Sequence, residues 1–541
     1  TKIDVGQFVL ATDTDGDAVS LAGKLLVDVE NDVPIRAEGA KTLEVQEDAL
    51  GHAVDTVGSV ADASLGNLDG AGDTDTAIFS LADLKAAVTD GADEPVAFSL
   101  VASGASGTVD GVTSRGQAIT WSSNGSVVTA QATDGTTTWT VFEVAVDQTN
   151  GLTFDLDDQV DHSLGVNGTD DEMLVTKIDV GQFVLATDTD GDAVSLAGKL
   201  LVDVENDVPI RAEGAKTLEV QEDALGHAVD TVGSVADASL GNLDGAGDTD
   251  TAIFSLADLK AAVTDGADEP VAFSLVASGA SGTVDGVTSR GQAITWSSNG
   301  SVVTGQATDG TTIWTVFEVA LDQTNGLTFD LDDQVDHGGN DNDDEMLTTK
   351  IDVGQFVLAT DTDGDAVSLA GKLLVDVEND VPIRAEGAKT LEVQEDALGH
   401  AVDTVGSVAD ASLGNLDGAG DTDTAIFSLA DLKAAVTDGA DEPVAFSLVA
   451  SGASGTVDGV TSRGQAITWS SNGSVVTAQA TDGTTTWTVF EVAVDQTNGL
   501  TFDLDDQVDH SLGVNGTDDE MLVTKIDVGQ FVLATDTDGD A

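Results

Sequence analysis

The stretch that decides the fold is residues 117–156, QAITWSSNGSVVTAQATDGTTTWTVFEVAVDQTNGLTFDL. Apolar and polar residues alternate along it, which is typical of half-buried β-strands. Asn-Gly and Asp-Gly pairs separate the runs and favour tight hairpin turns. Residues 178–187 and 194–204 alternate in the same way on either side of the segment DTDGD. Short strands separated by turns predict an all-β fold built as an antiparallel sandwich.

One stretch departs from this pattern. Residues 80–88, SLADLKAAV, predict a short helix, because Ser80 can cap its start and Asp83 stands at the third helical position. Phe79, Leu81 and Leu84 would then face the core. We expect one such helix in each repeat.

The sequence repeats with a period of about 175 residues: TKIDVGQFVLATDTDGDA begins at 1, 176, 349 and 524. Solenoid repeats are only about 20–50 residues long, so this period indicates an array of complete domains. The segment DVENDVP recurs at 28–34, 203–209 and 376–382, and its proline cannot join a central strand ladder. We therefore place domains at 33–207 (first repeat), 208–380 (second repeat) and 381–541 (third repeat). Residues 1–32 would be the end of a preceding repeat, and the third repeat would lack its last strand.

The composition narrows the class of partner. The chain has 98 acidic and 19 basic residues and a formal charge of −79. This charge argues against nucleic acid and against anionic lipid as partners, because both require clustered Lys and Arg. It favours multivalent cations. Cysteine is absent, so disulfides are excluded, and no apolar run approaches the ~20 residues of a membrane helix.

Two acidic motifs could bind such a cation. In DTDGD, alternate carboxylates around a glycine allow oxygens to converge on a hard ion, and calcium takes six to eight oxygen ligands. The glutamate at position 12 and the flanking helices of an EF-hand are missing, so this would be a different calcium loop. An exposed acidic turn is the alternative for the motif alone. The DTDGD residues are Asp13, Asp15 and Asp17, then Asp188, Asp190 and Asp192, Asp361, Asp363 and Asp365, and Asp536, Asp538 and Asp540.

Topology predicts that the two motifs meet. If the strands on either side of DTDGD are the last two of a repeat, their connecting loop lies at the end where that repeat begins. The incoming ENDVP segment lies at the same end. We therefore expect Glu30, Asn31 and Asp32 to meet the 188–192 loop. Likewise Glu205, Asn206 and Asp207 should meet 361–365, and Glu378, Asn379 and Asp380 should meet 536–540. Without a cation, carboxylates brought together in this way repel one another.

Other acidic residues leave more than one interpretation open. Glu47 and Asp48 in VQEDA could add ligands or lie at an exposed strand edge. DLDDQVDH contains Asp157, Asp161 and His162, but one histidine is too few for zinc. A structural or calcium role for Asp157 and Asp161 is more plausible.

We expect no catalytic activity. Cysteine and tyrosine are absent, and no motif of a hydrolase, metalloprotease or nucleotide-binding enzyme appears. Abundant carboxylates leave a glycosidase as a distant alternative. Trp121 and Trp139, predicted on neighbouring strands, could stack on sugar, but their period-2 positions favour a core role.

The repeat resembles the long tandem repeats of giant bacterial adhesins exported by type I secretion, often called RTX or biofilm-associated adhesins. The matching segments are VQEDAL (45–50), GLTFDLDDQVDH (151–162) and ATDTDGDAVSLAGKLLVDVENDVP (186–209). DVENDVP also looks like the calcium linker of cadherins, although Glu30 replaces one residue and the second asparagine is missing. The resemblance implies Ig-like sandwiches in an elongated rod, stiffened by calcium outside the cell.

The expected function is therefore a structural extender of a bacterial cell-surface adhesin, which holds a distal binding module away from the cell for adhesion and biofilm formation. Its expected partners are calcium and the neighbouring repeats, with no insertion into the membrane and the tip ligand outside this fragment. In the main alternative, the repeats themselves bind surface carbohydrate multivalently.

Overall fold

A computed structural model describes most of the chain and shows an all-β protein with three short helices in the described part, as expected. The described residues are 2–52, 57–58, 60–62, 65–68, 72–162, 172–227, 232, 236–237, 240–243, 247–338, 345–400, 405–406, 408–410, 414–416, 420–510, 520–537, 539 and 541. By internal contacts the chain divides into two compact units. One unit contains residues 1–212, 263–273 and 358–368, and the other contains 213–262, 274–357 and 369–541. Two segments of the second repeat are thus packed with the first repeat.

The first repeat contains all the element types of the fold. Its elements are β5 (Ile35–Arg36), β6 (Lys41–Gln46), the 3-10 helix η2 (Glu47–Ala49), β7 (Thr76–Ser80), α1 (Leu81–Ala86), β8 (Val88–Thr89), β9 (Ala97–Leu100), β10 (Ser106–Ser114), β11 (Gln117–Ser123), β12 (Val127–Thr133), β13 (Thr138–Asp147), β14 (Gly151–Leu156), β15 (Ile178–Asp179), η3 (Val180–Phe183), β16 (Val184–Thr187), β17 (Ala193–Ser195) and β18 (Leu200–Glu205).

Residues 117–156 form four consecutive antiparallel strands, β11 to β14, as their alternation predicts. They belong to a six-stranded sheet in the order β10-β11-β12-β13-β14-β7. The Asn-Gly and Asp-Gly pairs make the turns, where Gly125 and Gly135 have φ values of 92° and 90°. These backbone angles are open to glycine at little cost, which explains the residue choice.

Two three-stranded sheets cover this large sheet, in the orders β15-β18-β6 and β17-β16-β9. Their inward side chains, such as Val202 and Val184, join Phe142 and Phe154 of the large sheet in one hydrophobic core. All four of these side chains are fully buried. The sheets face one another across this core and form a β-sandwich. Packing the sheets together removes their apolar faces from water.

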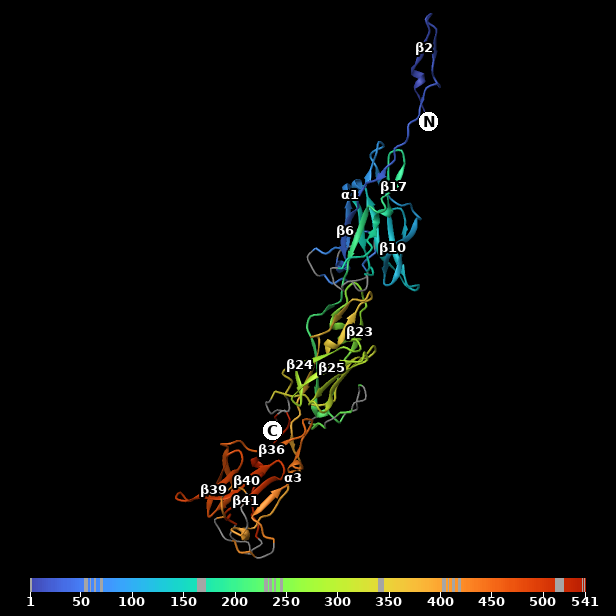
Figure 1. The fold of residues 1–541 in the computed structure, drawn as a ribbon. Helices are drawn as coiled ribbons and strands as arrows, with labels where there is room; N and C mark the ends of the chain where they lie inside the picture. Colours follow the sequence, from blue (N-terminus) through green and yellow to red (C-terminus); the bar gives the residue numbers. More distant parts are fainter. Residues whose placement is uncertain are drawn as a thin grey trace. The chain divides into compact units, whose positions relative to one another are not determined.

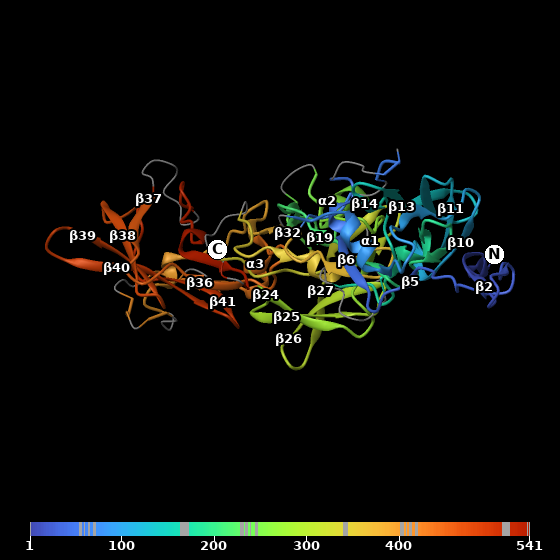
Figure 2. The same cartoon turned by 90° about the horizontal axis from the view of Figure 1, so that it is seen from above.

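The helix forms as predicted. The Ser80 side chain accepts a hydrogen bond from the Asp83 N–H, and the Asp83 side chain accepts one from the Ser80 N–H. These two bonds form a capping box at the start of α1. Phe79 and Leu84 are fully buried, and Leu81 packs against the same core. Helix α1 and strand β6 lie side by side in both ribbon views (Figure 1, Figure 2).

One strand pair differs from the expected antiparallel arrangement. Strand β6 pairs in parallel with β18, from Lys41 opposite Leu200 to Gln46 opposite Glu205. This pairing joins the first long strand of the repeat to its last strand. Parallel neighbours cannot be joined by a tight hairpin and need a long crossover connection. Here the rest of the repeat forms the connection between β6 and β18.

The second repeat has the same order of elements. They are β19 (Ile210–Arg211), β20 (Lys216–Gln221), η4 (Glu222–Ala224), β21 (Thr251–Phe254), α2 (Leu256–Ala261), β22 (Val263–Thr264), β23 (Ala272–Leu275), β24 (Ser281–Ser289), β25 (Gln292–Ser298), β26 (Val302–Thr308), β27 (Ile313–Asp322), β28 (Gly326–Leu331), β29 (Ile351–Asp352), η5 (Val353–Phe356), β30 (Val357–Thr360), β31 (Ala366–Ser368) and β32 (Leu373–Glu378). Strands β20 and β32 repeat the parallel pair.

The third repeat lacks a counterpart of β18 in the given sequence, and residues 389–394, which match β6, are not a strand. In the part of the chain that the structure describes, residues 389–394 lack a partner strand, because their counterpart in the first repeat, β6, forms its ladder with β18. The third repeat contains β33 (Ile383–Arg384), η6 (Glu395–Ala397), β34 (Thr424–Phe427), α3 (Leu429–Lys433), β35 (Val436–Thr437), β36 (Ala445–Leu448), β37 (Ser454–Ser462), β38 (Gln465–Ser471), β39 (Val476–Thr481), β40 (Thr486–Asp495), β41 (Gly499–Leu504), η7 (Gly529–Phe531) and β42 (Val532–Thr535). Residues 1–32 contain β1 (Ile3–Asp4), η1 (Val5–Phe8), β2 (Leu10–Thr12), β3 (Ala18–Ser20) and β4 (Leu26–Val27).

Candidate metal centre

Acidic and amide side chains meet where the first repeat ends and two loops of the second repeat pack against it, all within one compact unit. We call this the central junction. Its residues are Glu47, Gln159, His162, Asn206, Asp207, Asp268 and the DTDGD loop 361–365. Glu47, Gln159, Asn206, Asp207 and Asp268 are fully buried. Asp361 is also buried, whereas Asp363 and Asp365 are half-buried, so much of this negatively charged site is removed from water.

Asp207 lies at the centre of this junction. Its Oδ2 accepts a hydrogen bond from the Asn67 N–H of the first repeat at 2.9 Å and one from the Ala267 N–H of the second repeat at 2.7 Å. The Asn67 side chain also donates to the Val208 carbonyl at 2.9 Å. At Gly266 a Cβ atom would lie 2.5 Å from Asp207 Oδ2, so this position requires glycine. One carboxylate oxygen thus holds backbone from both repeats.

The two predicted motifs do meet. Asn206 Nδ2 donates to Asp365 Oδ2 at 2.6 Å, which confirms that the ENDVP segment lies beside the DTDGD loop. Within that loop Asp361 Oδ1 accepts the N–H groups of Gly364 and Asp365 at 2.8 and 2.7 Å. One oxygen from each of Asp361, Asp363 and Asp365 lies within 4.8 Å of the others. The loop therefore directs three carboxylates toward one point.

The first repeat contributes a second set of groups. Gln159 Nε2 donates to Asp268 Oδ1, and also to Thr362 Oγ1 at 2.8 Å. Glu47 Oε1 accepts the Val160 N–H at 2.5 Å. The buried Glu47 therefore belongs to the junction and not to an exposed strand edge, which settles one open interpretation.

His162 is part of the junction but is not oriented as a metal ligand. Its Nδ1 and Nε2 lie 3.1 and 3.0 Å from the carbonyl oxygens of Val160 and Val204. Its backbone N–H donates to Asp363 Oδ2 at 3.2 Å, and Nδ1 lies 3.8 Å from Glu47 Oε2. Both ring nitrogens thus face carbonyl oxygens of the first repeat.

Burial opposes ionisation of these carboxylates. It raises the pKa of Glu47 well above its usual range, and the charges of Asp207 and Asp363 raise it further. Burial likewise raises the pKa of Asp268, with repulsion from Glu47 adding to the effect. The pKa of Asp361 rises to about 8 through burial and its contact with Asp363. The site as described has more negative charge than its surroundings can stabilise.

Several oxygens at the junction have no hydrogen-bond partner among the described residues, although all of them are buried. They are Glu47 Oε2, Gln159 Oε1, Asn206 Oδ1, Asp207 Oδ1, Asp268 Oδ2, Asp361 Oδ2 and Asp363 Oδ1. Native proteins pair nearly all buried polar atoms, so such a group of oxygens calls for a ligand. A hard cation is the ligand that fits a set made only of carboxylate and amide oxygens.

The same arrangement recurs where the second repeat ends, within the other compact unit. Asp380 Oδ2 accepts the N–H groups of Asn242 and Ala440, each at 2.8 Å. Gln334 Nε2 donates to Asp441 Oδ1, and to Thr537 Oγ1 at 2.6 Å. We call this the C-terminal junction. Its recurrence shows that the contacts belong to the repeat and not to one copy.

The N-terminal junction, around Asn31 and Asp32, has no upstream repeat body in the given sequence. Asn31 Nδ2 donates to Asp192 Oδ2, and Asp32 Oδ2 accepts the Ala92 N–H at 2.7 Å. Asp188 and Asp190 cluster there with Asp93. Asn31 and Asp32 are exposed, whereas Asn206 and Asp207 are fully buried. Burial of the motif therefore depends on the repeat that precedes it.

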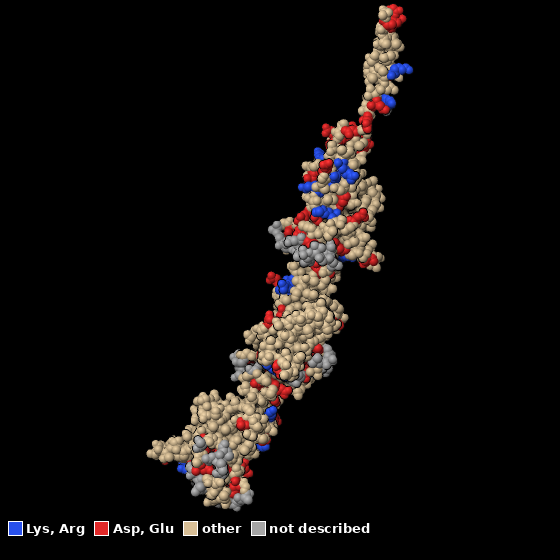
Figure 3. All heavy atoms as spheres, viewed as in Figure 1, with Lys and Arg blue, Asp and Glu red and all other residues tan. Residues whose placement is uncertain are grey.

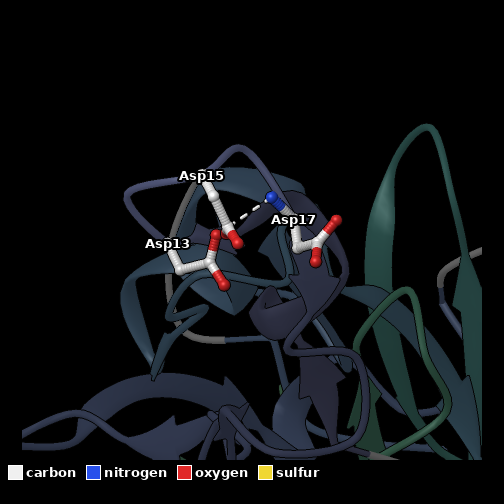
Figure 4. Close-up of side chains that lie close together, drawn as sticks. All are labelled: Asp13, Asp15 and Asp17. Carbon is white, nitrogen blue, oxygen red and sulfur yellow. Dashed lines mark hydrogen bonds between the residues drawn. The ribbon is translucent and has the colours of Figure 1, made fainter.

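Asp13, Asp15 and Asp17 form an exposed cluster in the N-terminal segment. Figure 4 shows their carboxylates around the loop, with the Asp17 N–H donating to Asp13 Oδ1 at 3.0 Å. The contact with Asp15 lowers the pKa of Asp13. Figure 3 shows acidic side chains gathered at the tip of the N-terminal segment, and both acidic and basic side chains on the visible face of the first repeat. Exposed acidic groups of this kind are common without a metal, so we do not include this copy among the candidate metal sites.

The remaining predicted residues have less informative positions. Glu205 and Glu378 form isolated bridges with Met173 and Met346, and Glu30 is exposed. Asp536 Oδ1 accepts the Gly539 N–H at 3.0 Å. Asp538 and Asp540 lie outside the described residues, so the expected meeting of 536–540 with Glu378, Asn379 and Asp380 is described only in part.

The Asp161 carboxylate has a structural partner, because its Oδ2 accepts the Gly116 N–H at 2.8 Å. Asp157 is fully buried, and its backbone N–H donates to the Val141 carbonyl at 2.8 Å. Asp48 is buried in η2. Sequence reasoning did not identify Gln159 or Asp268 as site residues. Asp268 precedes the cis Glu269–Pro270 bond in a loop remote in sequence from both motifs.

The tryptophans do not form a sugar-binding pair. Trp121 lies on β11 and Trp139 on β13, with β12 between them, so they are not on neighbouring strands as expected. Both are half-buried and pack against the core. Trp121 meets Phe183 edge-on at 5.1 Å, and the Arg115 guanidinium covers Trp139 at 5.3 Å. Each of these two rings therefore has a packing partner within the protein.

Comparison with known proteins gives one match. A family model described as a domain of unknown function, DUF5801, matches residues 217–373, which span the second repeat from β20 to the start of β32. Searches of curated proteins and of solved structures found no match. The family match indicates no type of enzyme. Among the described residues, no helix has the length and apolar character needed to cross a membrane.

Proposed function

We propose that the chain is a calcium-stabilised array of structural repeats that serves as an extender of a bacterial cell-surface adhesin. The observation that carries the proposal is the group of buried, unpartnered oxygens at the central junction. These oxygens come from the body of one repeat, from its last linker and from two loops of the next repeat. An ion bound among them would therefore fix one repeat to its neighbour.

Calcium fits this oxygen set better than other common ions. It accepts six to eight carboxylate, amide and carbonyl oxygens in irregular cages, whereas magnesium requires near-octahedral geometry and keeps several waters. Zinc prefers nitrogen and sulfur, and the chain has no cysteine. The amide oxygens of Gln159 and Asn206 would complete the coordination without adding charge.

The physical mechanism is a charge balance. Without an ion, the buried carboxylates of the junction destabilise the packed arrangement, because they repel one another and lose hydration. Bound calcium would offset both effects and would stabilise only the folded, joined state. By mass action this adds ~2.7 kcal/mol at a free calcium concentration 100 times the Kd. The high negative charge would keep the unfolded chain soluble in a calcium-poor compartment.

The proposed role is structural and lies outside the cell. The repeats lack disulfides, place their acidic motifs at junctions and carry no constellation that we assign to catalysis. A non-enzymatic extender that projects a separate binding module is the function that uses the junctions directly. The repeats need not bind carbohydrate for this role.

The test is the thermal unfolding of the complete 541-residue chain in calcium, in magnesium and in chelator, followed by circular dichroism. We expect calcium to raise the melting temperature by at least several degrees and magnesium to have a much smaller effect. Small-angle scattering on the same samples should show a larger, better-defined maximum dimension in calcium. Coincident melting curves and scattering profiles in calcium and chelator would reject the proposal.

A further inference from the structure

A strained arginine, Arg115, lies behind the central junction and is not among the proposed calcium ligands. Arg115 has φ 50°, in the left-handed region that non-glycine residues rarely adopt. Its counterparts Arg290 and Arg463 have φ 51° and 49°. Glycine would make this turn between β10 and β11 without strain, so the side chain must offset its own cost.

The guanidinium of Arg115 makes two contacts that account for this. Its Nη2 donates to both carboxylate oxygens of Asp158, at 2.9 and 3.0 Å, and the group stacks on Trp139 at 5.3 Å. The Asp158 side chain is fully buried, while that of Arg115 is 34% exposed. A buried carboxylate paired with arginine over an aromatic ring is held in one orientation.

The turn between β10 and β11 also holds the chain after Asp158, through hydrogen bonds to Asp161. The Gly116 N–H donates to Asp161 Oδ2 at 2.8 Å, and the Asp161 N–H donates to the Thr113 carbonyl at 2.8 Å. The Gln159 N–H returns to Asp158 Oδ1 at 2.9 Å. Residues 158–161 are therefore fixed at both ends by the β10–β11 turn.

This fixed segment presents groups to the central junction. The Gln159 side chain donates to Asp268 and Thr362. The Val160 N–H donates to Glu47 Oε1. Just after the segment, the His162 N–H donates to Asp363. None of these groups touches Arg115. The arginine can influence the junction only by holding the segment that carries them.

The third repeat shows that this support forms without a following repeat. Arg463 Nη2 donates to Asp506 Oδ1 at 2.8 Å and the guanidinium stacks on Trp487 at 5.0 Å. Gln507, the counterpart of Gln159, is nevertheless exposed, whereas Gln159 is fully buried. The arginine contact therefore does not depend on the junction.

We infer that Arg115 and Arg290 are positioning residues for the junction calcium sites, each holding the glutamine segment of its repeat in the orientation that the following repeat and the ion require. This inference rests on the proposed calcium function. Preorganisation of this kind raises affinity because less conformational freedom is lost on binding. Residues that orient metal ligands typically change metal affinity by about 10- to 100-fold when they are replaced.

The test compares three matched variants of the complete chain: Arg115→Met, Arg290→Met and Arg463→Met. Methionine keeps much of the apolar stem and removes the guanidinium. Calcium binding is measured by isothermal titration calorimetry, and unfolding in chelator by circular dichroism. All three variants should lose similar stability in chelator, because each loses the same ion pair and ring contact. Only Arg115→Met and Arg290→Met should weaken calcium binding, each by about 10- to 100-fold for the sites of one junction.

Arg115→Lys serves as a second variant in case the methionine change prevents folding. Lysine keeps the charge but loses the planar group that stacks on Trp139, so an intermediate loss of calcium affinity is expected. Unchanged calcium affinity in folded Arg115→Met and Arg290→Met, or an equal loss in Arg463→Met, would overturn the inference while leaving the calcium function intact. If the wild-type chain bound no calcium, the proposed function would fail and the inference with it.

Discussion

The carboxylate of Asp207 accepts the backbone N–H of Ala267 at 2.7 Å, and the same oxygen accepts the N–H of Asn67. Ala267 belongs to the second repeat and Asn67 to the first. A side chain in the linker thus replaces direct backbone pairing between two sandwiches. Its other oxygen, Oδ1, is buried and unpartnered among the described residues, which leaves it available to an ion. The repeat contact and the proposed metal site therefore share one carboxylate.

The first prediction concerns this carboxylate. Asp207→Ala removes the acceptor of two buried N–H groups and one proposed calcium ligand. Hydrogen bonds to charged groups contribute about 1.5–3 kcal/mol each, so we expect the calcium-dependent stabilisation of the first two repeats to fall markedly. Differential scanning calorimetry in calcium and in chelator measures this. Asp32→Ala is the matched control, because Asp32 has the same local sequence but is exposed. Equal losses in the two variants would contradict the prediction.

The second prediction concerns Gly266. In Gly266→Ala the new Cβ would lie 2.5 Å from Asp207 Oδ2, which forces the loop and the linker apart. Gly91→Ala creates a similar contact with Asp32 Oδ2 at 2.6 Å and has nearly the same φ, 78° against 72°. Both variants carry the same backbone strain, of roughly 1–2 kcal/mol. We expect only Gly266→Ala to reduce calcium affinity in a titration, because the exposed Asp32 can move away.

The third prediction concerns pH. Burial raises the pKa of Asp75 from 3.8 to about 6, and repulsion from Asp62 and Asp155 adds to this. Because the pKa is higher in the folded state, the contribution of Asp75 to stability is present below about pH 3.8 and is lost as the pH rises through about 6. In chelator, Asp75→Asn should remove part of the decline in melting temperature between these values.

The control for the pH prediction is Asp134→Asn at an exposed turn. Hydrogen bonds from Thr136 and Thr137 lower the pKa of Asp134 to about 2, so its titration lies below this window. Its replacement should leave the slope of melting temperature against pH unchanged between pH 4 and 6. If Asp75→Asn behaved in the same way, the carboxylate would not titrate as proposed.

The fourth prediction concerns the third repeat. Residues 389–394 have no strand partner in the described structure, whereas β6 and β20 pair with β18 and β32. Hydrogen exchange followed by mass spectrometry should show much faster exchange for 389–394 than for 41–46 and 216–221 in calcium. Equal protection of the three segments would show that the ladder does not determine their stability.

Local patterns were sufficient to predict the strands and the helix. Alternation between Gln117 and Leu156 indicated β11 to β14, and Ser80 with Asp83 indicated α1, because these signals lie within a few residues of one another. The parallel pairing of β6 with β18 could not be predicted in this way. It depends on how a chain of some 160 residues folds back, and no short segment records that.

The sequence also predicted only part of the candidate site. The contact between Asn206 and Asp365 followed from hairpin topology, which fixes where the loop must lie. Gln159 and Asp268 were not predicted, because neither belongs to a motif that is recognisable by its own residues. Glu47 remained ambiguous from the sequence, since only the packed junction shows that it is buried. The metal itself remains a prediction.

The parallel pair of β6 and β18 has a consequence for how the chain acquires its structure. Lys41 finds its ladder partner only at Leu200, so neither end of a repeat can complete the sheet alone. During synthesis, which proceeds from the N-terminus, the sheet stays open until nearly the entire repeat has left the ribosome. Contacts so distant in sequence form slowly. Each repeat can therefore complete this sheet only when almost all of its residues are free to fold together.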